Sequence, residues 1–128
     1  MFEKLEVVRM AQAMAAHAGA RQGAIARNVA NADTPGYRAL DLPDFAETWQ
    51  AAGDGAMRAT RPGHLAAADR QMALVARPSG GMAAPNGNTV SLEGEMVKAV
   101  EVRQQHDMAL AIYRSTSDIL RTALGRGR

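Results

Sequence analysis

The chain contains no cysteine and very few aromatic residues. Its 128 residues include one tryptophan, two tyrosines and two phenylalanines, together 4% of the sequence. Without cysteine, disulfide bonds and thiolate chemistry are excluded, and the redox compartment is left open. No apolar run reaches the roughly 20 residues that a membrane-spanning helix needs. The sequence therefore favours a protein without disulfide bonds, thiolate chemistry or a membrane-spanning helix.

Large apolar side chains are also scarce. Hydrophobic residues make up 47% of the chain, which has room for one domain, but much of that fraction is alanine. Burying a methyl group contributes about 0.8 kcal/mol, against about 1.5–3 kcal/mol for a large apolar side chain. We expect the core of an isolated chain to be thin.

The charge balance is mild, with a net charge of +2 at pH 7. Some of the basic residues gather at the end of the chain, at Arg121, Arg126 and Arg128. Nucleic-acid-binding proteins more often carry a dense basic stripe or arginines interleaved with aromatic residues, and neither is visible here. Nucleic acid is therefore not an expected partner.

The first six residues include Glu3 and Glu6, where a cleavable signal peptide would carry a basic leader and then an apolar run. We expect any export of this chain to proceed without a cleaved signal peptide.

A long helix is predicted from the start of the chain to about Asn31. Apolar or small residues recur at spacings of three and four, and the one polar interruption is Gln22. Gly19 and Gly23 each cost up to about 1 kcal/mol relative to alanine, so the helix needs a partner. Both a coiled-coil-like partner and a plain small bundle fit this pattern. The predicted stripe comprises Leu5, Val8, Ala11, Ala15, Ala18, Gln22, Ile25 and Val29.

A polar corner ends this helical pattern. Pro35 fixes its own φ and pushes Thr34 out of the helical region, and Gly36 stands where a type II turn needs positive φ. Short polar side chains before the turn can bond the helix end. An ordinary helix stop with a surface turn is the alternative. The corner residues are Asn28, Asn31, Asp33, Thr34, Pro35, Gly36 and Tyr37.

The middle of the chain is less regular. Leu40 to Phe45 predicts an extended arm, because Pro43 disfavours a central strand. Asp44 can cap a short helix from Phe45 to Ala51. The stretch from Leu65 to Val75 fits either a short helix or a loose β segment. A turn-rich linker follows, in which Asn86 and Gly87 could form a hairpin turn.

A second long helix is predicted after Ser91, a good N-cap residue. Glu93 and Glu95 lie in its first turn, where acidic side chains interact favourably with the helix dipole. The helix is predicted to end at Gly125 and Gly127. Its main stripe comprises Met96, Ala99, Arg103, His106, Leu110, Tyr113, Ser117, Leu120 and Leu124. A second strip beside it comprises Val97, Val100, Ala111, Ile112 and Ile119.

The expected fold is mainly α, with long N- and C-terminal helices packed as a coiled-coil-like pair and an extended, partly irregular middle. Within one unit of residues 1–128 we expect an N-terminal helix (1–31), a turn, arm and flexible middle (32–88) and a C-terminal helix (89–125). The predicted helix-packing residues are Leu5, Val8, Ile25, Val29, Met96, Leu110, Tyr113, Leu120 and Leu124.

No constellation for catalysis, cofactor or metal binding is apparent. His17, His64 and His106 are far apart and fit no metal-ligand spacing. Asp41 and Asp44 fit turn and cap roles, and no nucleophile lies nearby in the sequence. The glycines near Gly80 and Gly87 do not form a phosphate-binding loop. We predict no enzyme activity, no catalytic, cofactor or metal site, and no small-molecule substrate.

Two stretches resemble the flagellar rod and hook protein family. Residues 27–39, Arg-Asn-Val-Ala-Asn-Ala-Asp-Thr-Pro-Gly-Tyr-Arg-Ala, are similar to its N-terminal signature, and residues 40–45 are most similar to the proximal rod branch. Residues 87–96 resemble the lead into the C-terminal helix, although Gly94 departs from the expected pattern. The resemblance implies a structural subunit of the bacterial flagellar basal-body rod, joining an axial tube that transmits torque.

The resemblance also implies partners and a location. These are other copies of the chain, FlgC-like rod proteins, the MS-ring protein, a FliE-like adaptor and the flagellar type III export apparatus, in a periplasmic rod. Three other hypotheses remain at this stage. The first is a FlgC-type rod protein, and the second is a cytosolic helical adaptor or secretion chaperone that offers amphipathic helices to a client. The third, which the mild charge favours least, is a weakly basic DNA-associated helical protein.

Overall fold

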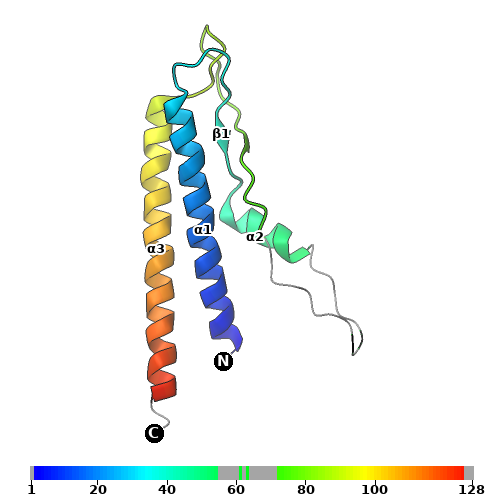
Figure 1. Ribbon diagram of the computed structural model, residues 1–128, viewed down its shortest axis with the longest axis vertical. Helices are drawn as coiled ribbons and strands as arrows, with labels where there is room; N and C mark the ends of the chain where they lie inside the picture. Colours follow the sequence, from blue (N-terminus) through cyan, green and yellow to red (C-terminus); the bar gives the residue numbers. More distant parts are fainter. Residues whose placement is uncertain (1, 55–60, 62, 64–71, 126–128) are drawn as a thin grey trace.

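The computed structural model describes residues 2–54, 61, 63 and 72–125, and within them the chain is mainly helical (Figure 1). Both long predicted helices are confirmed, at 29 and 34 residues. Ser91 caps the second one, because its Oγ accepts the Gly94 N–H at 3.3 Å. In chain order the elements are α1 (Phe2–Ala30), β1 (Leu40–Asp41), α2 (Phe45–Asp54), β2 (Arg77–Pro78) and α3 (Leu92–Gly125).

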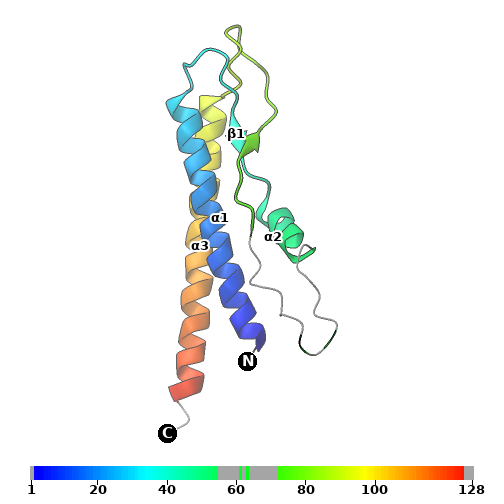
Figure 2. The same cartoon turned by 45° about the vertical axis from the view of Figure 1, so that its right-hand side comes forward.

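The two long helices lie side by side and antiparallel in both views (Figures 1 and 2). The start of α1 and the end of α3 therefore lie toward the same end of the pair, and α3 extends beyond the start of α1. The buried positions recur every seven residues, as in a coiled coil. This confirms the predicted coiled-coil-like pair. The seam consists of Ala11, Ala18 and Ile25 on α1 and of Glu95, Val102 and Ala109 on α3.

The side of α3 that is buried differs from the predicted main stripe. Met96, Arg103 and Tyr113 are exposed, and the buried seam instead passes through Val102 and Ala109. Because α3 has two apolar strips, apolar residues recur at spacings of three and four on more than one face. The hydrophobic periodicity alone therefore does not identify which face is buried against α1. On α1 the predicted stripe is closer, since Ala11, Ala18 and Ile25 are buried while Gln22 and Val29 are exposed.

A second face of α1 packs against the extended arm that follows the corner. The arm is confirmed as extended, and β1 pairs antiparallel with β2, with Leu40 opposite Pro78. His17, only 1% exposed, donates from Nε2 to the Pro43 carbonyl at 2.7 Å. Its ring also meets the edge of Phe45. The arm thus runs back along α1 on a different side from α3 (Figure 2).

The predicted short helix begins at Phe45, as expected, and continues to Asp54 as α2. The Asp44 carbonyl accepts the N–H and the hydroxyl of Thr48, both at 3.0 Å, at the start of this helix. Asn86 and Gly87 belong to a tight turn, but β2 pairs with β1 and not across that turn. Most of the undecided stretch from Leu65 to Val75 lies outside the described residues, and 72–76 has no regular structure.

Candidate functional site: the polar corner and the outer helix faces

The predicted turn at the end of α1 has the expected conformation. Gly36 has φ +72°, and the Tyr37 N–H donates to the Thr34 carbonyl at 3.3 Å. Before the turn, the side-chain amide of Asn31 donates to the Arg27 carbonyl at 2.8 Å, and the same carbonyl accepts the Asn31 backbone N–H at 3.1 Å. A left-handed glycine directly after a proline is what a type II turn requires.

A second asparagine, Asn88, holds the bend from the other end of the chain. Its side-chain nitrogen lies 2.8–2.9 Å from the carbonyl oxygens of Asn31, Ala32 and Thr34. Its side-chain oxygen accepts the Val90 N–H at 2.8 Å. Asn88 is not among the residues predicted from the sequence, although an asparagine three residues before a capping serine is a signal for an Asx turn.

Asn28 joins three segments at the centre of the corner. This side chain is completely buried. Its Nδ2 donates to the Leu40 carbonyl at 2.7 Å and to Glu95 Oε2 at 3.0 Å. Its Oδ1 accepts the Leu40 N–H at 2.8 Å and the Tyr37 hydroxyl at 3.4 Å. The side-chain amide of Asn28 thus bonds both the N–H and the C=O of Leu40, as the backbone of a neighbouring strand would. It thereby connects β1 to both long helices.

Charged residues extend this network from α1 through the arm to α3. Arg21 donates two hydrogen bonds to Asp41, at 2.9 and 3.2 Å. Lys98 Nζ lies 3.4 Å from Asp41 and 3.1 Å from Glu95. Since Glu95 is only 3% exposed, Lys98 and Asn28 together offset the cost of burying its carboxylate. Five polar side chains therefore connect α1, the arm and α3 without a break.

The electrostatics of this network favour the charged forms of its members. Burial raises the pKa of Asp41, but the hydrogen bonds and charge of Arg21 outweigh burial, and the pKa lies below its ordinary 3.8. The Asp41 hydrogen bond raises the pKa of Arg21. For Lys98, burial lowers the pKa, but the hydrogen bonds and charges of Glu95 and Asp41 outweigh burial, and the pKa lies above its ordinary 10.5.

Acid should weaken the corner through Asp41. A carboxyl group with a depressed pKa in the folded state contributes stability that is complete above its unfolded pKa and is lost as the pH falls through the folded value. We expect Asp41→Asn to cost about 2 kcal/mol at pH 7 and to flatten the loss of stability below about pH 4. Urea denaturation across this pH range measures both effects. Asp33→Asn, at an exposed corner residue, is the control and should change neither.

The Gly36 turn gives a prediction about assembly. Gly36→Val places a β-branched side chain at positive φ, which costs about 1–2 kcal/mol. Apart from Gly36 and its two chain neighbours, nothing lies within 4 Å of the added Cβ, so the effect arises from the local backbone conformation. We expect export to continue while incorporation and motility are lost. Gly36→Asn, which tolerates this conformation, should swim; normal swimming of the valine variant would count against the role of the turn.

The predicted helix-packing residues divide into two groups within one chain. Ile25 is buried in the seam with Ala18 and Val102, and Val8, Leu110 and Leu120 are half-buried. The others face outward, and whether neighbouring chains cover them stays a prediction. These exposed residues are Leu5, Val29, Met96, Tyr113 and Leu124.

More large apolar side chains lie exposed than the seam buries. Besides Met96, Tyr113 and Leu124, α3 exposes the second strip that its sequence predicts, including Val97, Val100, Ile112 and Ile119. Monomeric proteins rarely expose contiguous apolar patches of this extent unless another molecule binds them. The outer helix faces are therefore candidate contact surfaces.

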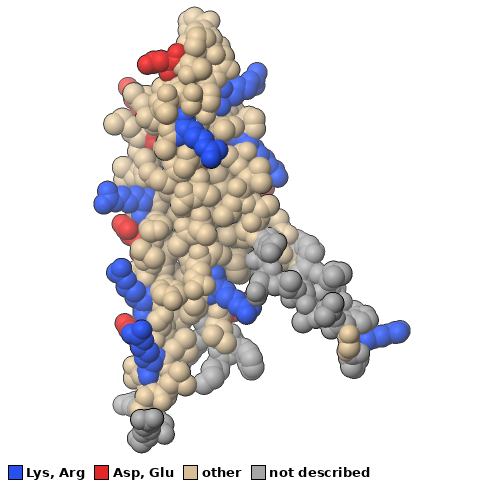
Figure 3. Space-filling model, in the orientation of Figure 1, with Lys and Arg blue, Asp and Glu red and all other residues tan. Residues whose placement is uncertain are grey.

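The charged residues on the surface show no comparable concentration. On the face drawn in Figure 3, Lys and Arg side chains are scattered and do not gather over one element. None of the described helices combines the length and the hydropathy of a membrane-spanning segment. Over the described residues, no three His, Asp or Glu side chains come together as potential metal ligands.

Comparison with known proteins connects the corner to a family. A family described as flagella basal body rod protein matches residues 11–38, which span most of α1 and the turn. The chain is 29% identical over 119 residues to the flagellar basal body rod protein FlgB of Agrobacterium fabrum, covering 88% of each chain. It is 34% identical over 107 residues to FlgB of Cereibacter sphaeroides, covering 81% of this chain and 82% of that one.

These matches also decide between the hypotheses that the sequence left open. The relatives that match over most of their length carry the name FlgB. Neither a FlgC-type rod protein nor a cytosolic adaptor or secretion chaperone is favoured.

Proposed function

The chain belongs to the flagellar basal body rod protein family, and from this membership we propose that the outer faces of α1 and α3 pack against neighbouring subunits to form an axial tube. The protein is a structural subunit of the proximal rod and is located in the flagellar basal body. It assembles there with other flagellar components. Within the tube, residues 1–128 act as one rod-protein unit that transmits torque.

The observation that carries this proposal is the exposed apolar surface of both long helices. One chain leaves Leu5, Met96 and Leu124 in contact with water, at exposures of 49%, 63% and 69%. Burying such side chains against a neighbour contributes about 1.5–3 kcal/mol each. The seam between α1 and α3 consists mainly of small residues and does not supply this stabilisation within one chain. Contacts with neighbouring subunits therefore bury the outer faces of the helices.

The polar corner supplies the rigidity that torque transmission requires. The chain of ion pairs from Arg21 through Asp41 to Lys98 and Glu95 fixes the arm to both helices. A buried polar network that is fully paired specifies one geometry, because any other leaves a charge without a partner. We propose that the corner sets the angle between α1 and the arm in every subunit.

The finer assignments of partner and location rest on the same family. We propose that the subunit meets other copies of itself, the MS-ring protein and a FliE-like adaptor on the side of the cell, and FlgC-like rod proteins distally. It reaches the periplasmic rod through the flagellar type III export apparatus without a cleaved signal peptide. Its role is mechanical, and we propose that it catalyses no reaction.

Purified basal bodies test this function. In the native bacterium, deletion of the gene should abolish swimming and leave basal bodies without rod, hook or filament. Complementation should restore them, with the intact chain present in the rod fraction and its first residues retained, as mass spectrometry would show. A complemented strain whose basal bodies lack the chain would contradict the proposal.

A further inference from the structure

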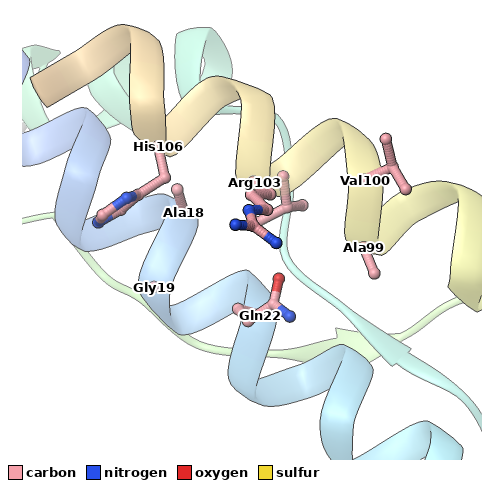
Figure 4. A pocket seen from close by; sticks show the side chains of 8 residues that line it. Ala18, Gly19, Gln22, Ala99, Val100, Arg103 and His106 are labelled. Atoms are coloured by element: carbon pink, nitrogen blue, oxygen red, sulfur yellow. The ribbon is translucent and has the colours of Figure 1, made fainter. Parts of the chain in front are cut away.

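One groove between α1 and α3 remains open, on the side of the helix pair away from the arm. It has a volume of about 450 Å³ and is lined by α1 at Ala18, Gly19 and Gln22 and by α3 at Ala99, Arg103 and His106. Figure 4 shows the Arg103 and Gln22 side chains pointing toward each other across it. Its floor is formed by small residues together with the buried Val102, so the backbone of another helix could approach closely beside the small residues.

Arg103 gives the groove a positive charge that no acidic side chain in the described part of the chain neutralises. This side chain is exposed, and no carboxylate of the described residues forms an ion pair with it. Gln22 is also exposed, and His106 is half-buried. The groove therefore fits a helix that brings large apolar side chains to its floor and one acidic side chain to Arg103.

The opposite side of α3 carries a surface with these properties. At about 3.6 residues per turn, this surface lies about half a turn from the residues of α3 that line the groove. It contains exposed apolar side chains and a single acidic one, Glu101. We call it the α3 strip, and it consists of Val97, Glu101, Met108, Ile112 and Ile119.

We propose that the α3 strip of a second copy of this chain occupies the groove, with Glu101 of that copy facing Arg103. This inference rests on the proposed rod function and names the surfaces that copies use. The contact is heterologous, because strip and groove lie on opposite sides of the molecule. Each copy can therefore bind one neighbour through its groove and a second neighbour through its α3 strip, which builds a ring or a helical array.

Two charge variants test the pairing. The full-length purified chain should self-associate in sedimentation velocity, and Arg103→Glu or Glu101→Arg alone should weaken association at least about tenfold, since each places like charges in contact. Mixing the two variants should restore association, because each strip then meets a groove of opposite charge. The double variant should associate like the wild type.

A third variant tests the floor of the groove. Gly19→Leu places a large side chain in the groove, and apart from its chain neighbours and its own helix backbone nothing lies within 4 Å of the added Cβ. Leucine also favours the helix. We expect thermal stability at or above the wild type together with lost association. Gly23→Leu is the matched control, since Gly23 is equally open but does not line the groove.

The outcomes separate this inference from the proposed function. A wild type that stays monomeric, mixed variants that remain apart, or Gly19→Leu that associates normally would each overturn the strip-in-groove contact. Presence of the chain in purified basal bodies would still support the rod function in those cases.

Discussion

Replacing Asn28 with alanine should lower the free energy of unfolding by about 3 kcal/mol or more. The variant removes a donor from the buried carboxylate of Glu95 and leaves the N–H and C=O of Leu40 without their partner. Each buried polar group left unpaired costs about 1–3 kcal/mol, and more for a charged one. Urea denaturation at pH 7, followed by helical circular dichroism, measures the loss.

Asn31→Ala is the matched control for this variant. Asn31 lies three residues further along and is an asparagine of the same corner, but its side chain bonds the Arg27 carbonyl at an exposed position. A loss within about 1 kcal/mol is expected there. Equal effects of the two substitutions would show that burial of Asn28 with Glu95 does not organise the corner.

The second large effect concerns assembly and not folding. Leu124→Glu changes a side chain near the end of α3 that is 69% exposed in one chain, so the stability of the free chain should change by no more than about 0.5 kcal/mol. If a neighbouring subunit buries Leu124, the charge becomes desolvated in the rod, and swimming should be abolished. Soft-agar motility and the content of purified basal bodies provide the measurements.

Arg121→Gln, at an exposed polar residue one turn before Leu124, serves as the control. It should swim normally while expressing and folding like the wild type. Normal motility of Leu124→Glu would mean that this part of α3 stays in contact with solvent in the rod, against the predicted packing face.

Local signals in the sequence sufficed for the helices and the turn. The run without proline before the corner, the Pro35-Gly36 pair and the Ser91 cap each act over a few residues. For that reason both long helices begin and end close to their predicted bounds. The corner was located from its short polar side chains, and these are the residues that bond the end of α1.

Contacts between distant residues could not be predicted in the same way. Asn28 and Glu95 are 67 positions apart, and their bond depends on the register of the helix pair. Its place in the first turn predicts only that Glu95 interacts favourably with the helix dipole, yet this residue lies in the seam. His17 and Arg21 stand one turn apart on α1, and this spacing is a signal that a second face of the helix is polar and packed.

The choice of the buried face of α3 shows a further limit. Both strips of this helix are apolar at helical spacing, so the hydrophobic pattern fits burial of either. The seam that forms is the one that places Glu95 against Asn28 and Val102 against Ala18. Polar pairing at the corner, invisible to hydrophobic periodicity, thus fixes the rotation of α3 and leaves its larger apolar residues outside.

Hydrogen exchange tests most directly whether lateral contacts complete the terminal helices. The amides of α3 from Leu110 to Gly125, followed by mass spectrometry, should exchange rapidly in the purified chain, because their outer faces are exposed and the seam beside them is thin. In isolated basal bodies the same amides should become strongly protected. Equal and strong protection of this segment in the free chain and in basal bodies would contradict the account.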